Sequence, residues 1–472
     1  MVTIRSLRKS KSKGKVITIV IVVAVILLIC AGGSMAAYQA KHFNKNVSIN
    51  GVNVGGLTAK AAVTKLEKTK LDNNVWLNGK ILCTGKTTAS DFTAQDAPKV
   101  KEILKKQYTF FPSTKEKNYN ALTGQNNDYR TTTLKDKVQQ KLVQANKTRT
   151  PAQDAYAVLK DGKVSVVQAK DGDQYNVTAM MNEYDHQINN DKIDLKSILQ
   201  KPLTASSKEI ETQKTKLQDL AAQSVDYKVE DQTYTLPAKE MITSATYSDG
   251  KYKINAQTLK DKIDQINKDK ATLNKKFNFT TSNGKKIQVQ GKTYGWAINV
   301  NKAIASIENA YEKHTKNVDA KADIYGLGYN RHGTGYGVTS NDGIGNTYAE
   351  LSIQDQHAWF YKDGKLVDQV DVVTGNHQTH SDTPTGVYYI MYQQSPSILR
   401  GTHPNGQPYS CQVQYWSQFT DDGCGFHDAW WRHNWAKDAY LTDGSDGCAN
   451  IKPSQAKQVY DSLKPNEPVV VY

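Results

Sequence analysis

"YAELSIQDQHAWFYKDGKLVDQVDVVTG" occupies residues 348–375 and decides the fold of the last part of the chain. Apolar and polar residues alternate through this stretch, which is typical of strands with one buried face. Asp363-Gly364 separates two alternating runs, and an Asp-Gly pair favours a two-residue hairpin turn. "TPTGVYYIMY" (383–392) adds a Pro-containing turn and a further expected strand. Residues 346–472 are therefore expected to form a mainly-β domain, either a sandwich or a barrel.

The chain before this domain divides by composition. Residues 326–345 are rich in glycine and are expected to be a linker or a long covering loop. Two segments further upstream, 161–188 and 283–311, align with one gap, and each runs from a turn through a strand to an Asn-Val pair that opens an amphipathic helix. Two tandem α+β modules, at 47–200 and 203–325, account for this repetition.

The N-terminus predicts a membrane segment. Residues 1–15 carry six Lys or Arg and no acid, and residues 16–38 carry no charge. About 20 apolar residues cross a hydrocarbon core of about 30 Å as a helix. Because a basic flank stays on the cytoplasmic side, the basic tail is expected in the cytoplasm and everything after residue 38 outside the membrane. The competing interpretation is a cleaved signal peptide, for which the apolar stretch is long.

The net charge of the chain indicates which classes of partner it could bind. The 472 residues carry a formal net charge of +15, which suits an anionic membrane surface or an anionic wall polymer. The sequence contains no zinc-finger or helix-turn-helix pattern, so nucleic acid is not expected as a partner.

Cys448 is the candidate nucleophile, in "GSDGCANI" (444–451). A thiol of ordinary pKa is only a few per cent thiolate at pH 7, so it needs a base, and an oxyanion formed on a carbonyl substrate needs main-chain donors. Small residues around Cys448 permit a tight turn that could supply such donors. His427 and His433 both lie upstream, and their positions alone do not choose between them.

The last 125 residues resemble the YkuD-type L,D-transpeptidase domain. That family carries a histidine, 14 to 17 residues, and then a Ser/Thr-His-Gly-Cys segment. His427 is followed by seventeen residues and then by Ser445-Asp446-Gly447-Cys448, whereas His433 leaves only eleven. "VVTG" (372–375) and "TPTG" (383–386) resemble further blocks of the family in the same order. The chain departs from the family pattern at Asp446, where a histidine is usual.

The part of the chain before this domain is similar to the peptidoglycan-binding modules of Gram-positive L,D-transpeptidases. The similarity lies in residues 47–66 and 291–299, and the arrangement resembles the membrane-anchored enterococcal type. It implies a single-pass protein whose catalytic domain faces a Gram-positive cell wall.

The resemblance implies a mechanism and a role for each site residue. Cys448 would form a thioester on a stem tetrapeptide with release of D-Ala, and the side-chain amine of a second stem would resolve it into a 3→3 cross-link. His427 would be the base and Ser445 would orient a partner by hydrogen bonding. Asp446 would offer His427 its backbone carbonyl, and the backbone N–H of Gly447 would hold the oxyanion. No cofactor or metal is implied, and carbapenems would acylate Cys448.

Other interpretations stay open at this stage. The chain could be a wall-binding scaffold with weak or no activity, because Asp446 replaces the usual histidine, or an L,D-carboxypeptidase or protein-anchoring variant. Cys448 could instead pair with Cys411 or Cys424. A metal site using His427, Asp428, His433 and a cysteine can be drawn, but no ligand-pair spacing typical of a metal site supports it. A cluster of three tryptophans could be a hydrophobic lid or a sugar-stacking platform; its members are Trp430, Trp431 and Trp435.

Overall fold

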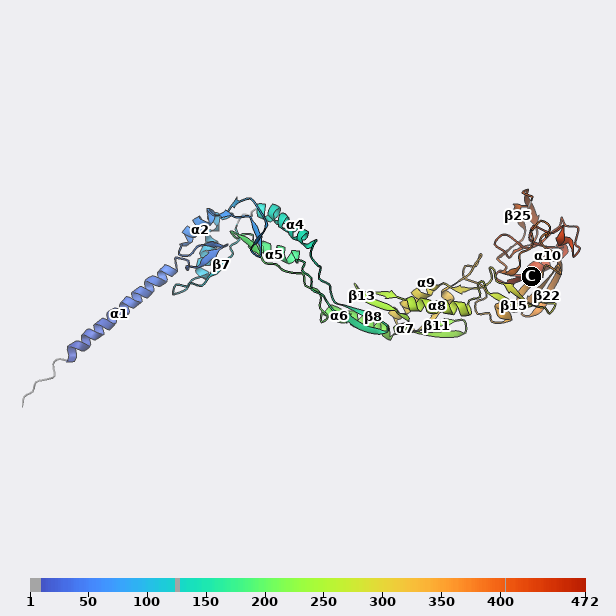
Figure 1. Cartoon of the computed structure of the whole chain (residues 1–472), viewed down its shortest axis with the longest axis horizontal. Coiled ribbons are helices and arrows are strands. Elements are labelled where there is room, and N and C mark those ends of the chain that lie inside the picture. The colour runs from blue at the N-terminus through green and yellow to red at the C-terminus, as the bar shows by residue number, and fades with distance from the viewer. Residues whose placement is uncertain (1–9, 124–127, 404) are drawn as a thin grey trace, which may run out of the picture. The chain divides into compact units, whose positions relative to one another are not determined.

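The structure, a computed structural model, describes residues 10–123, 128–403 and 405–472 (Figure 1). They form two compact units. The first comprises the described residues up to Ala155 together with Gln168–Thr204, and the second comprises Tyr156–Val167 together with Ala205–Tyr472. Residues 1–9 of the predicted cytoplasmic tail lie outside the described residues.

The predicted membrane segment is a helix, α1 (Ser10–Gln39). Within it, Val16–Gln39 is long and apolar enough to cross a membrane by length and composition. Its large apolar side chains from Val16 to Ile29 are exposed. The helix could therefore be a membrane anchor or a signal sequence.

The rest of the first unit has two small cores. One lies between α2, α3 and the sheet β2-β1-β7, and the other between α4, α5 and the sheet β10-β4-β5. The helices are α2 (Ala59–Glu67), η1 (Ala94–Asp96), α3 (Ala97–Lys106), η2 (Tyr129–Leu134), α4 (Lys135–Asn146) and α5 (Val177–Gln187). The strands are β1 (Val47–Ile49), β2 (Val52–Asn53), β3 (Lys70–Leu71), β4 (Val75–Leu77), β5 (Lys80–Cys83), β6 (Thr88–Ala89), β7 (Lys117–Tyr119) and β10 (Ile193–Leu195).

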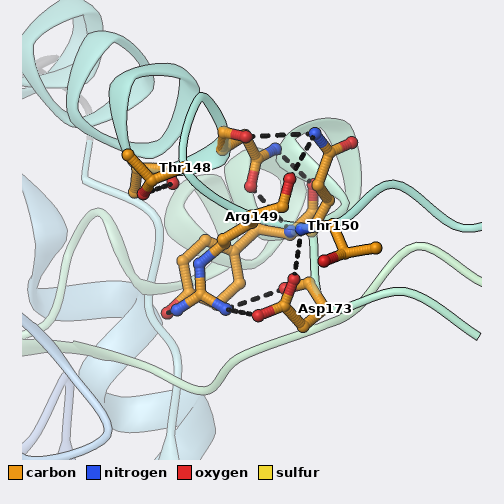
Figure 2. Close-up of polar contacts among 8 residues, drawn as sticks. Thr148, Arg149, Thr150 and Asp173 are labelled. Carbon is orange, nitrogen blue, oxygen red and sulfur yellow. Dashed lines mark hydrogen bonds and ion pairs between the residues drawn. The ribbon is translucent and has the colours of Figure 1, made fainter.

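A cluster of polar contacts follows the C-terminal end of α4 (Figure 2). The Arg149 guanidinium lies over the Tyr175 ring, 4.0 Å from its centroid, and donates to the Tyr175 hydroxyl at 2.6 Å. It also donates to the Asp173 carbonyl at 2.8 Å, and the Asp173 carboxylate accepts from the Thr150 amide at 2.6 Å. These contacts join the chain leaving α4 to the chain entering α5.

The second unit begins with an α+β body around one core, except that the hairpin at 276–290 contributes its buried residues to a separate core shared with residues of the last domain such as Val387 and Val470. Its helices are α6 (Lys208–Ala222), α7 (Ala238–Met241), α8 (Gln257–Lys270) and α9 (Val300–Lys313). Its strands are β8 (Tyr156–Lys160), β9 (Lys163–Val167), β11 (Ser224–Val229), β12 (Gln232–Pro237), β13 (Ser244–Ser248), β14 (Lys251–Asn255), β15 (Lys276–Thr280), β16 (Lys286–Gln290), β17 (Ala297–Ile298), β18 (Asn317–Asp319) and β19 (Ile324–Tyr325).

The hairpin β8–β9 crosses the boundary that the sequence suggests. It lies within the predicted module 47–200, yet β8 pairs with β13, where Leu159 faces Ala245. The result is a four-stranded sheet, β14-β13-β8-β9. Because this hairpin of the first predicted module pairs within the second unit, the module boundaries at 47–200 and 203–325 stay a prediction.

The two Asn-Val pairs open helices, as predicted. The Asn176 side chain accepts from the Ala179 amide at the start of α5, and the Asn299 side chain accepts from the Lys302 amide at the start of α9. Each bond satisfies one of the backbone N–H groups that a helix start leaves without a partner. The α9 helix is amphipathic, as predicted, and its buried residues include Ala303 and Ile307.

Residues 346–472 are mainly β, as predicted, and their strands form one mixed nine-stranded half-barrel sheet. Its order is β23-β30-β20-β21-β22-β29-β28-β27-β24. The strands are β20 (Tyr348–Ser352), β21 (His357–Lys362), β22 (Lys365–Val373), β23 (Gly386–Tyr389), β24 (Tyr392–Gln394), β27 (Trp416–Gln418), β28 (Gly425–Asp428), β29 (Ala449–Ile451) and β30 (Pro468–Val471), with a separate hairpin of β25 (Ser397–Thr402) and β26 (Pro408–Val413) and a helix, α10 (Pro453–Asp461).

The two halves of the sheet share one core, in which the Phe360 and Phe426 rings lie 5.6 Å apart. Strand β22 belongs to both halves. Most of its length pairs with β21 through the predicted Asp363-Gly364 turn, while its last residues, Val372 and Val373, pair with β29 on the other edge. One long strand therefore joins both halves of the sheet. Alternation reveals that each strand has a buried face, but it does not reveal which strands pair.

The predicted linker at 326–345 is packed against the rest of the second unit. Thr334 is buried, and its side chain accepts from the Gly295 amide at 2.9 Å. The Asp342 carboxylate accepts from Lys275 at 2.6 Å and from the Asn278 amide at 2.7 Å. Of the two sequence interpretations, these contacts favour a covering loop.

Candidate active site

Two neighbouring parallel strands bring the candidate residues together. In β28 and β29, His427 lies opposite Asn450, and Cys448 directly precedes β29. Ser445 forms a parallel bridge with Gly375 just after β22. As a result, His427, Ser445 and Cys448 line one cavity of about 370 Å³, although His427 lies about twenty positions before the other two residues along the chain.

Cys448 is a free, half-buried thiol. No disulfide joins any of the five cysteines, all of which lie in described residues, so pairing with Cys411 or Cys424 does not occur. The thiol donates to the carbonyl oxygen of Gly423 at 3.7 Å. Burial raises the pKa of the Cys448 thiol, and the neighbouring Cys424 raises it further. The resting thiol is therefore protonated.

His427 is buried, with 4% of its surface exposed, and both ring nitrogens have partners. Nδ1 lies 2.8 Å from the carbonyl oxygen of Asp428, and Nε2 lies 3.1 Å from Nδ2 of Asn450. Trp431 stacks on the ring, with centroids 5.7 Å apart. Burial lowers the pKa of His427, so the ring is a neutral imidazole around pH 7.

The contacts of His427 differ from one expectation, and they do not include Cys448. The carbonyl that contacts the ring belongs to Asp428 and not to Asp446, because a strand residue reaches the carbonyl next to it more easily than a loop across the cavity. In addition, no hydrogen bond joins His427 to Cys448 in the described chain. The two side chains share a cavity, and Nε2 faces Asn450 in the resting state.

Ser445 holds the turn before Cys448. Its hydroxyl donates to the carbonyl of Cys448 at 2.6 Å and accepts from the amide of Gly447 at 3.1 Å. Gly447 has φ +119°, a conformation that favours glycine, and its carbonyl accepts from Thr383 at 2.7 Å. The N–H expected to hold the oxyanion is thus occupied by Ser445 in this state.

Asp446, where the chain departs from the family pattern, contacts the hairpin β25–β26. Its carboxylate accepts from Nδ1 of His403 at 2.6 Å, and the His403 ring contacts the Tyr409 ring, with centroids 4.8 Å apart. Leu399 and Tyr409 of the hairpin line the cavity opposite Cys448. Asp446 therefore connects the segment that carries Cys448 to one wall of the cavity.

Sequence reasoning missed several residues of this site. Asn450 could have been found, because it stands two positions after Cys448 and points to the same side of a strand. Arg432 and His403 reach the cavity from other segments, and no sequence spacing indicates this. Of the predicted tryptophan cluster, Trp431 lines the cavity, while Trp430 is largely exposed.

Comparisons with known proteins concern mainly the last part of the chain. A family model described as the L,D-transpeptidase catalytic domain, YkuD, matches residues 346–471. No curated protein matches the chain. Among solved structures, an L,D-transpeptidase variant from Enterococcus faecium is 25% identical over 55% of this chain and 98% of its own, with a TM-score of 0.43.

Two further structures cover the last part of the chain. The catalytic domain of the E. faecium L,D-transpeptidase is 37% identical over 27% of this chain and 96% of its own, with a TM-score of 0.25. The L,D-transpeptidase from Mycobacterium smegmatis is 19% identical over 27% of this chain and 58% of its own, with a TM-score of 0.24. Through residues 346–471, the chain belongs to the YkuD family of L,D-transpeptidases, enzymes with a cysteine nucleophile.

Proposed function

We propose that this chain forms 3→3 cross-links between peptidoglycan stem peptides through a thioester on Cys448. The observation that carries the proposal is the meeting of a free thiol and a neutral imidazole in one cavity, on neighbouring parallel strands. Family membership supports peptidoglycan cross-linking as the reaction class.

In the first step, Nε2 of His427 takes the thiol proton as Sγ of Cys448 attacks the carbonyl carbon of the third, L-centred stem residue. For this, Nε2 exchanges its contact with Asn450 for the thiol. The C–N bond to the terminal D-Ala breaks, the amine of D-Ala takes the proton from His427, and a thioester remains on the enzyme. Because both groups start neutral, proton transfer accompanies attack and no thiolate accumulates beforehand.

In the second step, the side-chain amine of another stem attacks the thioester carbon and gives a proton to His427. The C–S bond breaks, the sulfur of Cys448 recovers a proton from His427, and an amide joins the two stems. The oxyanion in both steps needs a main-chain donor. The role predicted for the Gly447 N–H requires that it exchange Ser445 for the oxyanion.

The location that we propose follows from α1 and from the charge of the chain. As a single-pass anchor with the basic tail in the cytoplasm, α1 would place the catalytic domain in a Gram-positive wall. The net charge of +15 suits anionic wall polymers, and the modules at 47–200 and 203–325 would bind peptidoglycan.

A catalytically weak scaffold is the second candidate, favoured by the raised pKa of Cys448 and by Asp446 beside it. Acylation by a carbapenem separates the two functions. Residues 40–472 should gain one carbapenem mass, Cys448→Ala should gain none, and Cys411→Ala should behave as the native protein. An adduct that persists in Cys448→Ala contradicts the nucleophile assignment, and absence of any adduct on the native chain favours the scaffold.

A further inference from the structure

We infer that Arg432 is a positioning residue, which acts through Asn450 to hold His427 in the tautomer that can accept the proton of Cys448. This inference rests on the proposed function, in which His427 is the base. Arg432 lies in the segment between β28 and β29, outside the motif that the sequence indicates, and nothing in its spacing marks it.

Arg432 is held firmly in place. Its side chain is only 7% exposed. Nη1 donates to the carbonyl of Asp443 at 2.5 Å and lies 3.5 Å from the Asp443 carboxylate. A turn in which the Arg432 amide donates to the carbonyl of Ala429 sets Trp431 on the His427 ring and Arg432 beside Asn450. A buried cation with these partners has little freedom to move.

The contact with Arg432 decides which way the Asn450 amide faces. Nε of Arg432 can only donate, and it lies 3.0 Å from Oδ1 of Asn450, which accepts. The NH₂ group of Asn450 must then face His427, where it lies 3.1 Å from Nε2. Because an NH₂ group donates, Nε2 carries no proton.

The other end of the ring gives the same assignment independently. The Asp428 carbonyl, 2.8 Å from Nδ1, can only accept, so Nδ1 carries the proton. His427 is therefore the Nδ1–H tautomer, whose unprotonated Nε2 is the nitrogen that a base needs. Without Arg432, the Asn450 amide is free to turn over, and its oxygen would then favour a proton on Nε2.

Arg432 also acts on His427 through its charge. A cation close to the ring disfavours the imidazolium form, and this adds to the effect of burial on the pKa of His427. Asp428, which follows His427 on β28, has the opposite effect and raises the pKa of His427. The other ionisable groups that line or adjoin the cavity are Asp443, Asp446, Cys448, His403, Tyr409 and Cys411.

Three variants separate the two contributions. Arg432→Gln removes the charge, Arg432→Lys keeps the charge but lacks the Nε contact, and Arg331→Gln is an exposed control in the same unit. The readouts are the tautomer of His427, from nitrogen-15 shifts of its ring, and the rate of carbapenem acylation between pH 5 and 9.

For Arg432→Gln we expect loss of the pure Nδ1–H signature and acylation slower by about tenfold or more at pH 7. Removing the cation raises the pKa of His427, so the fall in rate on the acid side moves to higher pH. Arg432→Lys should also lose the Nδ1–H signature of His427, but its acylation rate should fall on the acid side at the same pH as that of the native protein. If both variants match Arg331→Gln in tautomer and in pH profile, the inference is wrong. If the native protein itself fails to acylate while its His427 shows the expected tautomer, the proposed function fails and this positioning role of Arg432 does not.

Discussion

The contact between Asp446 and His403 gives a prediction with a definite size. The two side chains are separated by 2.6 Å and are 33% and 46% exposed, respectively. A contact between side chains exposed to this degree contributes about 0.2–1 kcal/mol, because water competes for its hydrogen bond. Since 1.4 kcal/mol corresponds to a factor of ten, the contact should favour the hairpin conformation that lines the cavity over other conformations by about fivefold at most.

A double-mutant cycle measures this bias. Asp446→Ala, His403→Ala and the double variant are compared with the native protein for the second-order rate of carbapenem acylation. Each single variant should change the rate by about two- to fivefold in the same direction, and the double variant should resemble either single one. The cycle removes the separate effect of losing the contact between His403 and Tyr409. Asp461→Ala, which breaks the exposed pair with Lys457 on α10, is the control and should leave the rate unchanged.

Two results would refute this reasoning. If the effects of the single variants multiply in the double variant, the two residues act independently and the contact does not hold the hairpin. If Asp446→Ala alone slows acylation a hundredfold or more, Asp446 takes part in the chemistry.

Three further predictions concern other contacts. Because burial raises the pKa of Cys448, its alkylation by iodoacetamide should rise through and beyond pH 8.5, and a plateau below pH 7 would instead indicate a preformed thiolate. Asn299→Ala removes the cap that accepts from the Lys302 amide and should cost about 1 kcal/mol in urea unfolding, whereas Asn299→Ser should cost little; equal losses would contradict the capping role. Gly447→Ala would need φ +119° and would place its Cβ 2.8 Å from Sγ of Cys424, so it should cost about 1–3 kcal/mol in stability. Adding Cys424→Ala should not restore the loss, and full restoration would show that backbone conformation is not the constraint.

Local signals in the sequence predicted local structure well. The alternation in 348–375 and the turn at Asp363-Gly364 gave β21 and β22, and two Asn-Val pairs marked the starts of α5 and α9. These features depend on residues within a few positions of one another. The pairing of β8 with β13 joins residues about 85 positions apart, and no local pattern encodes it.

The site divides in the same way. The choice of His427 over His433 came from the spacing within a known motif, and the structure places His427 in the cavity with Cys448. The partners of these residues could not be predicted, because they depend on the parallel register of β28 and β29 and on where the intervening segment turns. That register sets Asn450 against His427, and the turn after β28 supplies Arg432. Likewise, only the three-dimensional turn reveals that Ser445 occupies the Gly447 N–H.

A mass spectrum of the products tests whether Cys448 carries the acyl group of a stem peptide. Residues 40–472 are incubated with a disaccharide-tetrapeptide that ends in D-Ala and whose third residue has a side-chain amine. If Cys448 forms the thioester, the spectrum shows a product with the mass of two substrates less one D-Ala, a thioester adduct on the peptide that contains Cys448, and neither species with Cys448→Ala. A dimer formed equally by Cys448→Ala, or an adduct on another residue, would contradict this role of Cys448.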